Sequence, residues 1–332
     1  MTKVSRQNSK KYIMKTKCIF SKQNKHGKAN MENKKVAVIM STYNGEKFVR
    51  EQLDSILNQT YKNIEIVVRD DGSKDGTVDI VKEYQSKHNN IKLIEGENLG
   101  FVNSFFELLD LADADYYAYA DQDDVWLENK IELAVQELNK LDDSKPNMVF
   151  GNSDYYDVNM NFIGYGDKDK KFSFLRSLFS CIGQGMTFTI NQKTKEMISQ
   201  HRPESCFFHD WWTYILCMGL GNVAYNNVTT VKYRRRKENA TSEGQGYFRL
   251  LVWRFKNLLF GSGMKDIKQQ MLNFKKIFYN DLSEENKKII DLFGNEKYSF
   301  IKAIKKAFYP KRIRSKLSDE IMLRVLFIFG SL

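Results

Sequence analysis

The sequence predicts an α/β fold in which a mostly parallel β-sheet is flanked by helices and followed by a helical C-terminal extension. Short apolar runs alternate with segments of helical periodicity from residue 36 to residue 141. A polar, often acidic, turn follows each apolar run. This alternation is typical of parallel strands joined by crossover helices. The extension is predicted by the basic, aromatic and aliphatic segments that follow residue 240.

Four apolar runs predict the first strands, at residues 36–40, 64–68, 91–94 and 116–120. The first run, Val-Ala-Val-Ile-Met, has no polar interruption, as expected for a strand that is buried on both faces. The segments between the runs have helical periodicity and predict three crossover helices. Because parallel strands connected in this order end at the same edge of the sheet, we expect the polar turns to converge there.

The second half of the chain continues the pattern less regularly. Residues 127–141 have helical periodicity, and residues 148–151 and 186–190 each predict a further strand. A helix is predicted from Asp210 to Cys217, and another apolar segment precedes Tyr233. The α/β unit therefore extends to about residue 240.

Charge divides the chain into three parts. Residues 1–33 carry nine Lys or Arg against one acid and lack apolar periodicity, so we expect a disordered basic tail. Residues 34–240 form the predicted α/β domain, of which residues 34–233 carry 21 basic and 30 acidic side chains. Residues 241–332 form the predicted helical basic region; from residue 234 onward, 22 basic side chains oppose 10 acidic ones. Basic ends around an acidic middle suggest a polyanionic surface as partner, either anionic lipid or nucleic acid.

Several classes of protein are disfavoured by what the sequence lacks. The four cysteines form no Cys-x-x-Cys pair, so we expect reduced thiols in a cytoplasmic protein. No apolar run is long enough for a transmembrane helix, and the basic N-terminus has no signal-peptide core. Met31 lies just before the first strand and is a plausible natural start. Only Gly45 follows the first strand, so neither a nicotinamide-binding fingerprint nor a P-loop is present.

An acidic cluster follows the fourth predicted strand. Asp121, Asp123 and Asp124 fall within four residues, at the edge where open α/β sheets bind ligands. Carboxylates this close repel one another unless a cation lies among them, and hard divalent cations prefer oxygen ligands. A solvated turn that caps the next helix is the structural alternative.

Four motifs in order carry a resemblance to a known family. They are residues 41–44 (Ser-Thr-Tyr-Asn), 55–60 (Ser-Ile-Leu-Asn-Gln-Thr), 70–73 (Asp-Asp-Gly-Ser) and 121–124 (Asp-Gln-Asp-Asp). Together they resemble glycosyltransferase family 2, which has a GT-A-type nucleotide-sugar fold. Residues 120–126 and 209–212 (His-Asp-Trp-Trp) most resemble its bacterial rhamnosyltransferase branch. The resemblance covers about residues 34–240.

The resemblance implies a set of donor-binding residues. Asp123 would contact a divalent metal, Mg²⁺ or Mn²⁺, and Asp121 would contact the ribose or the metal shell. A carboxylate that accepts a ring N–H suits uracil or thymine, and an aromatic ring could stack on the base. The residues expected to bind the nucleotide sugar are Ser41, Tyr43, Asp71, Asn103, Asp121, Arg234 and Arg236. The family pattern has a histidine where this chain has Arg236 or Lys237, and arginine can hold a diphosphate but cannot bind a metal.

The resemblance also implies an acceptor side. Asp210 matches the position of the catalytic base, and Gln184, Trp211 and Trp212 would bind the acceptor. An N-capping Asp210 beside two core tryptophans is the structural alternative. The glycines that flank Gln184 are equally compatible with an ordinary turn.

These residues imply an inverting glycosyltransferase that moves a sugar, with rhamnose as the candidate, from a dTDP- or UDP-sugar to a lipid-linked polysaccharide acceptor. We expect a peripheral protein on the inner face of the plasma membrane, held by anionic lipid, with no nucleic-acid partner. A nucleotidyltransferase acting on sugar phosphates is the enzymatic alternative, although the basic glycine-rich loop of that class is missing. A nucleic-acid-binding protein that uses the basic ends is the other, and the acidic middle of the chain argues against it.

Overall fold

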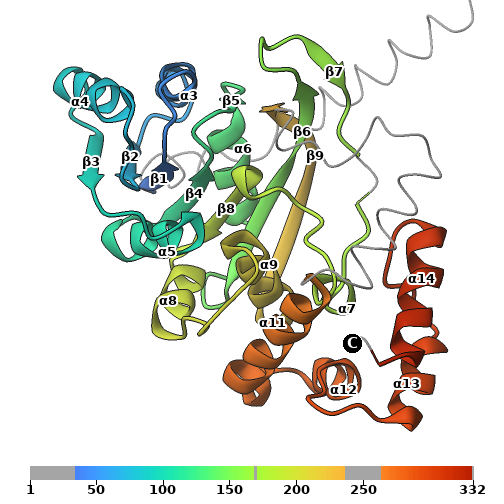
Figure 1. Cartoon of the computed structure of the whole chain (residues 1–332). Coiled ribbons are helices and arrows are strands. Elements are labelled where there is room, and N and C mark those ends of the chain that lie inside the picture. The colour runs from blue at the N-terminus through green and yellow to red at the C-terminus, as the bar shows by residue number, and fades with distance from the viewer. Residues whose placement is uncertain (1–33, 168–169, 236–262, 331–332) are drawn as a thin grey trace, which may run out of the picture. The chain divides into compact units, whose positions relative to one another are not determined.

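The computed structural model describes residues 34–167, 170–235 and 263–330. The predictions on the basic tail, on Arg236 and on residues 241–262 of the helical basic region lie outside these residues. A nine-stranded sheet has the order β3-β2-β1-β4-β8-β6-β9-β5, and β7 pairs with β6 (Figure 1). The strands are β1 (Val36–Thr42), β2 (Ile64–Asp70), β3 (Ile91–Glu95), β4 (Tyr116–Ala120), β5 (Val125–Trp126), β6 (Asn147–Tyr156), β7 (Phe162–Gly164), β8 (Phe188–Asn191) and β9 (Asn222–Arg234).

The first half of the sheet is parallel, as the alternating pattern predicts. Strand β1 lies between β2 and β4, and β2 pairs with β3, all in parallel register. The crossover helices are α3 (Val49–Leu57), α4 (Thr77–Lys87) and α5 (Phe101–Leu111). The carboxyl ends of β1, β2 and β4 therefore meet at one edge, next to the acidic cluster.

The second half makes the sheet mixed. Strand β8 is antiparallel to both β4 and β6, β6 is parallel to β9, and the short β5 is antiparallel to β9. The α/β class with flanking helices is confirmed, but half of the strand pairs are antiparallel. Apolar runs indicate a buried strand without indicating its direction, so the sequence did not distinguish these pairings.

Alternate residues of the central strands face two helical layers. Val36, Val38 and Met40 belong to the core that contains residues of α3, α4 and α6 (Lys130–Leu138). Ala37 and Ile39 belong to a second core that contains residues of α5, α8 (Gln192–Gln200) and α9 (His209–Leu220). This period of two explains why the strands read as unbroken apolar runs.

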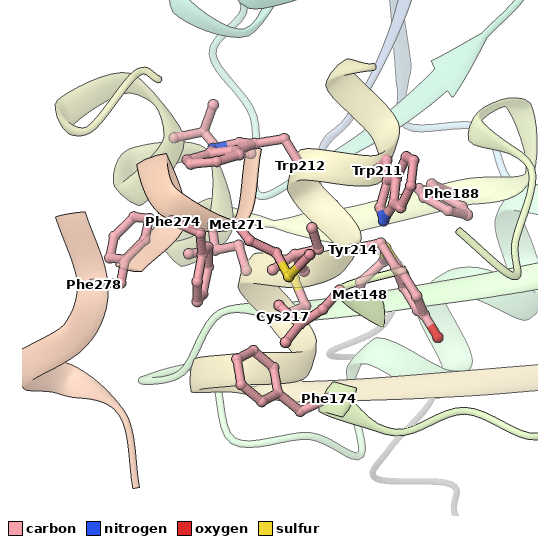
Figure 2. Packing of buried hydrophobic residues seen from close by; sticks show 14 of the residues in the cluster. Met148, Phe174, Phe188, Trp211, Trp212, Tyr214, Cys217, Met271, Phe274 and Phe278 are labelled. Atoms are coloured by element: carbon pink, nitrogen blue, oxygen red, sulfur yellow. The ribbon is translucent and has the colours of Figure 1, made fainter. Parts of the chain in front are cut away.

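The C-terminal helices extend the second core. They are α11 (Gly263–Phe278), α12 (Glu284–Phe293), α13 (Phe300–Ala307) and α14 (Leu317–Ile328). Trp212 of α9 packs against Phe274 and Phe278 of α11, with ring centroids 5.9 and 6.3 Å apart (Figure 2). Phe179, which follows the short α7 (Phe174–Ser177), packs against Phe327 of α14 at 5.7 Å. Residues 263–330 therefore share a hydrophobic core with the α/β unit. None of the helices in the described residues is both long and apolar enough to cross a bilayer.

Candidate active site

A cavity of about 640 Å³ opens at the carboxyl ends of β1, β2 and β4, beside the N-terminus of α9. Most of its polar lining comes from the turns that follow these strands, as expected for an open α/β sheet. The lining residues are Ser41, Tyr43, Asp71, Asn98, Gly100, Phe101, Phe105, Asp121, Gln122, Asp123, Gly185, Phe208, His209 and Asp210.

Asp70 ends β2 and Asp71 follows it, and the two carboxylates have different roles. The Asp70 carboxylate accepts hydrogen bonds from the backbone of Ser73 at 2.8 Å and from the Thr42 hydroxyl at 2.9 Å, so it shapes the turn. Asp71 lines the cavity and pairs with the guanidinium of Arg69. The structure thus separates a turn-forming acid from a cavity acid that the motif alone does not distinguish.

The Asp71 carboxylate is held rigidly and keeps capacity for a ligand. One oxygen accepts from Arg69 and from the backbone of Leu99 at 2.9 Å, and the other accepts from the backbone of Gly100 at 2.9 Å. Gly100 has a φ of +76°, a conformation that suits glycine, and this brings its N–H to the carboxylate. Since a carboxylate offers about four acceptor sites, one site on the second oxygen is left for a donor in the cavity.

Ser41 and Tyr43, at the end of β1, also line the cavity. The Ser41 hydroxyl donates to the Ser104 hydroxyl at 2.7 Å, and the Tyr43 side chain is 47% exposed. Gln122 exchanges two hydrogen bonds of 3.0 Å with the Tyr43 backbone. Gln122 therefore joins the β1 turn to the acidic loop, a role that the sequence analysis did not assign.

Two of the three clustered acids face the cavity. Asp121 and Asp123 line it, whereas Asp124 is fully buried. Burial, followed by the charges of Asp121 and Asp123, raises the pKa of Asp124 well above its ordinary value. One Asp124 oxygen accepts from the Arg234 backbone at 3.0 Å, and the other finds no hydrogen-bond partner among the described residues.

Arg234 lies behind the acidic loop, outside the set of described residues that line the cavity. Its guanidinium donates to the carbonyls of Asp123 at 2.7 Å and Val158 at 2.6 Å, pairs with Glu51, and lies over the Phe48 ring. The side chain is only 3% exposed. The prediction that Arg234 contacts the nucleotide sugar is therefore wrong for this structure, because its donors are directed at the backbone that supports Asp123.

The cavity acids fit a divalent cation that is shared with a ligand. Among the described residues, no group of three or more His, Cys, Asp or Glu side chains is arranged to hold a metal by itself. Mg²⁺ is usually bound by one or two carboxylates together with substrate phosphates. Asp121 and Asp123 supply such a pair of oxygen donors. Asp124, the next residue in the sequence, has one carboxylate oxygen without a hydrogen-bond partner among the described residues.

Asp210 begins the opposite wall, in the first turn of α9. Burial raises the pKa of its carboxyl to about 6, although the backbone N–H groups of Trp211 and Gly185 lower it in part. A Cβ atom on Gly185 would lie 2.8 Å from an Asp210 oxygen, so this position needs glycine for a close approach. The Gln184 side chain is not among the described residues that line the cavity, and its amide oxygen accepts a hydrogen bond from the Ser153 hydroxyl.

His209 is a neutral cavity residue. Its ring stacks on Phe105 with centroids 3.9 Å apart and planes 11° apart. Burial lowers the pKa of the imidazole to about 3, so it carries no charge at physiological pH. Its Nδ1 atom is buried without a hydrogen-bond partner in the part of the chain that the structure describes.

Trp211 and Trp212 are core residues, so the prediction that they bind the acceptor needs correction (Figure 2). Trp212 is 0% exposed among the α11 aromatics, and the Trp211 indole N–H donates to the Ser177 carbonyl at 2.6 Å. Their place on α9 directs them into the sheet–helix core and not into the cavity. Asn103 is exposed on α5, outside the residues described as lining the cavity, and its amide donates to the Leu99 carbonyl.

Phe101 and Phe208 provide the aromatic surface that the tryptophans do not. Both line the cavity, their ring centroids are 5.7 Å apart, and they are 50% and 40% exposed. Phe208 immediately precedes α9 and Phe101 begins α5. Sequence reasoning missed both residues, and only the cavity geometry identifies them.

The profile of Glycosyl transferase family 2 matches residues 37–208. A dTDP-rhamnosyl transferase, RfbG, from Shigella flexneri is 29% identical over 222 residues, which are 60% of this chain and 72% of that protein. An uncharacterized glycosyltransferase from Rickettsia typhi is 27% identical over 263 residues, 77% of this chain and 80% of that protein.

Two solved structures share the fold. Residues 1–349 of Staphylococcus aureus TarS, in complex with UDP-GlcNAc, superpose with a TM-score of 0.51 at 14% identity, covering 89% of this chain and 92% of that one. The mannosyltransferase PcManGT from Pyrobaculum calidifontis, in complex with GDP-Man and Mn²⁺, gives a TM-score of 0.50 at 17% identity, covering 90% and 86%. With a family match over more than half of its residues, the chain belongs to glycosyl transferase family 2 and is a glycosyltransferase.

Proposed function

We propose that this enzyme transfers a sugar, with inversion at the anomeric carbon, from a dTDP- or UDP-sugar to a lipid-linked saccharide. The observation that carries the proposal is the single cavity that gathers Asp71, the pair Asp121 and Asp123, and Asp210. These groups match the three needs of the reaction: recognition of the nucleotide, neutralisation of the leaving diphosphate, and removal of a proton from the acceptor.

Asp71 is the residue proposed to recognise the nucleotide base. Its remaining acceptor site suits the ring N–H of uracil or thymine, and cytosine has no such N–H. Tyr43 offers an exposed ring for stacking, and Ser41 a hydroxyl nearby on the same wall. The relative named as a dTDP-rhamnosyl transferase and the TarS complex with UDP-GlcNAc support a pyrimidine nucleotide, with rhamnose as the candidate sugar.

Asp121 and Asp123 would hold the divalent metal that the donor set fits, Mg²⁺ or Mn²⁺. When bound, such a cation supplies positive charge to the diphosphate oxygens. The solved complex of PcManGT with Mn²⁺ supports this assignment. Asp121 and Asp123 would hold this cation at the edge of the cavity.

Asp210 is the proposed general base. Its carboxylate takes the proton from the acceptor hydroxyl while the acceptor oxygen bonds to the anomeric carbon. The bond from that carbon to the diphosphate oxygen breaks on the opposite face, and the nucleoside diphosphate leaves with the electron pair. One base and one displacement give inversion without an enzyme nucleophile. A pKa of about 6 leaves Asp210 mostly ionised at neutral pH and still a stronger base than an ordinary aspartate.

Phe101 and Phe208 are the proposed platform for the acceptor sugar. Aromatic rings bind the apolar face of a pyranose. The Phe101 ring contacts that of Phe208 and that of His209, the residue before Asp210. Because a lipid-linked acceptor stays in the bilayer, we place the enzyme at the inner face of the plasma membrane as a peripheral protein.

Binding of nucleoside diphosphates to the purified protein, measured by calorimetry in the presence of Mn²⁺, tests the donor assignment. We expect dTDP and UDP to bind and CDP to bind at least about tenfold more weakly, since one hydrogen bond to a charged group is lost. Turnover is then followed with dTDP-rhamnose and UDP-sugars and a lipid-linked saccharide fraction. Equal affinity for CDP and UDP would contradict base recognition by Asp71. Tighter binding of GDP than of UDP would indicate that the donor is a GDP-sugar.

A further inference from the structure

Helix α14 carries an exposed apolar stripe on the side opposite its buried face. Leu323, Leu326 and Phe327 are at most 1% exposed and pack into the core. The other side presents Leu317, Ile321, Val325 and Ile328, which are spaced four, four and three residues apart and are between 36% and 63% exposed. This spacing places them on one helical face. Apolar side chains on two opposite sides of a helix indicate that the outer side is also covered, by protein or by another apolar medium.

Helix α13 adds a second exposed stripe beside the first. Phe300, Ile301 and Phe308 are 64–76% exposed. The Tyr298 hydroxyl, just before α13, donates to the Ile328 carbonyl at the end of α14 at 2.9 Å, so the two helices meet there (Figure 1). Phe329 lies at the same end and is 76% exposed. We call these exposed apolar side chains of α13 and α14 the C-terminal apolar face.

Positive charge surrounds this face. Residues 296–330 carry nine Lys or Arg and three acids, and Lys305, Arg312 and Lys316 are exposed. Lys268, Lys302 and Lys306 meet with Tyr298 around one small pocket between α11 and α13. Lys306 is 4% exposed, and burial together with the charges of Lys268 and Lys302 lowers the pKa of its ammonium to about 8. These three ammonium groups add to the positive charge beside the C-terminal apolar face.

We propose that the C-terminal apolar face docks on an anionic lipid bilayer, with the exposed Lys305, Arg312 and Lys316 lying in the headgroup layer. The proposal deepens the proposed function and rests on it, because a lipid-linked acceptor requires the enzyme to come to the membrane. Exposed Phe, Ile and Leu side chains enter the boundary between headgroups and acyl chains, and the basic rim stays in the headgroup layer.

The positive charge around the C-terminal apolar face favours an anionic bilayer over a second copy of the chain or another segment of it. A second copy docked through the same face would bring two basic rims together. The segments of this chain outside the described residues are also basic: residues 1–33 carry nine basic side chains and one acid, and residues 236–262 carry five and two. An anionic surface is the partner whose charge is complementary to the rim.

Vesicle co-sedimentation of the full-length protein tests the docking surface. The vesicles are phosphatidylcholine alone, or phosphatidylcholine with phosphatidylglycerol. Ile321→Ser with Phe329→Ser removes apolar side chains that are already exposed, and Leu111→Ser, on α5 and 54% exposed, is the matched control. Lys305→Gln with Lys316→Gln removes exposed charge from the rim, and Lys145→Gln is its control.

We expect the wild type and both controls to pellet with anionic vesicles and to bind neutral ones weakly. The charge variant should lose about thirtyfold in partition constant, and salt should reduce wild-type binding. The apolar variant should lose at least about tenfold, independently of salt. Turnover on a detergent-dispersed acceptor should stay unchanged in both.

Equal pelleting of the wild type and the apolar variant would overturn the proposal. So would a wild-type dimer in sedimentation equilibrium that the apolar variant abolishes, because the face would then bind a second copy. Turnover with dTDP- or UDP-sugars is scored on the same samples. Vesicle binding without any turnover would contradict the proposed function and leave the docking surface intact. Turnover without vesicle binding would contradict the docking surface and leave the proposed function intact.

Discussion

Asp210 combines two properties that oppose each other. Burial at the cavity wall raises the pKa of its carboxyl to about 6, which makes it a better base, but it also destabilises the ionised form. The titratable groups around it add no charge at neutral pH. Burial raises the pKa values of Cys181, Cys206 and Tyr119, and it lowers that of His209. The charge state of this wall therefore depends on Asp210.

Asp210→Asn is expected to lower turnover by about two orders of magnitude or more while leaving UDP affinity unchanged. In the wild type, kcat/KM should fall about tenfold per pH unit below about pH 6, because the base becomes protonated there. Steady-state rates across a pH series, with calorimetry for UDP, measure both effects. Near-native turnover of the variant would assign the base to another carboxylate.

The same substitution should stabilise the fold at neutral pH. The folded pKa of about 6 exceeds the ordinary 3.8, so the folded protein binds more protons than the unfolded chain between these pH values. Its stability therefore falls as pH rises through that window. Asp210→Asn should recover up to about 3 kcal/mol above pH 6 and almost nothing below pH 3.8. Urea unfolding at both pH values provides the comparison.

Asp123→Ala tests the expected metal dependence. A chelator should stop turnover of the wild type and added Mn²⁺ should restore it, because the cavity carboxylates and the diphosphate must share positive charge. Asp123→Ala should stay inactive at any Mn²⁺ concentration and should keep its melting temperature, since the side chain faces the cavity. Full activity of the chelated wild type would contradict a metal requirement.

The residues at strand ends were the most predictable part of the site. Ser41, Tyr43, Asp71, Asp121 and Asp123 follow the carboxyl ends of β1, β2 and β4, and topology alone brings them to one edge. Trp211 and Trp212 were misplaced because the directions of their side chains depend on how α9 packs, whereas the roles of Gln184 and Asn103 stay predictions. No sequence period reports whether an aromatic at a helix start faces a core or a cavity.

At the scale of elements, β9 supports the acidic loop from behind. The end of this strand delivers the Arg234 backbone to Asp124 and its guanidinium to the carbonyl of Asp123. The sequence could not predict this arrangement, since β5, the two-residue strand that pairs with β9, has no detectable pattern. Helix α8 was not predicted, and α11 and α12 were predicted only as part of the helical region 241–332. The boundaries of α8 and α12 follow the polar caps Asn191 and Ser283.

Arg234→Lys distinguishes two roles of Arg234: holding the acidic loop in place and binding the donor directly. Lysine cannot donate to the Asp123 and Val158 carbonyls and to Glu51 at once, so at least one buried acceptor loses its partner. We expect a loss of about 1–3 kcal/mol in unfolding free energy together with a lower kcat. Glu51→Gln is the control, since Glu51 is half exposed and its pair should contribute little. Weaker UDP binding at unchanged stability would instead show that Arg234 contacts the diphosphate.

At the scale of the whole molecule, the C-terminal helices are part of the catalytic unit's core. Phe327 of α14 contacts Phe179 and Phe293, with ring centroids 5.7 and 5.6 Å apart, and Phe274 of α11 contacts Trp212, which is two residues after Asp210 on α9. The sequence predicted helices in the basic region 241–332, with anionic lipid as their partner. Their basic, apolar composition did not reveal that one side of each is already covered by protein.

A shared core predicts that Phe327→Ala weakens the whole enzyme and not only its C-terminus. The ring is 1% exposed, so its removal should cost about 3–5 kcal/mol, and the protein should still unfold in one step. Phe329→Ala, two residues away and 76% exposed, is the matched control and should cost almost nothing. Urea unfolding is followed by circular dichroism and by tryptophan fluorescence, which reports mainly on the α/β unit through Trp126, Trp211 and Trp212. Coincident, equally shifted curves are expected for Phe327→Ala. An unchanged tryptophan transition, with an early loss of helical signal alone, would mean that residues 263–330 fold as a separate domain.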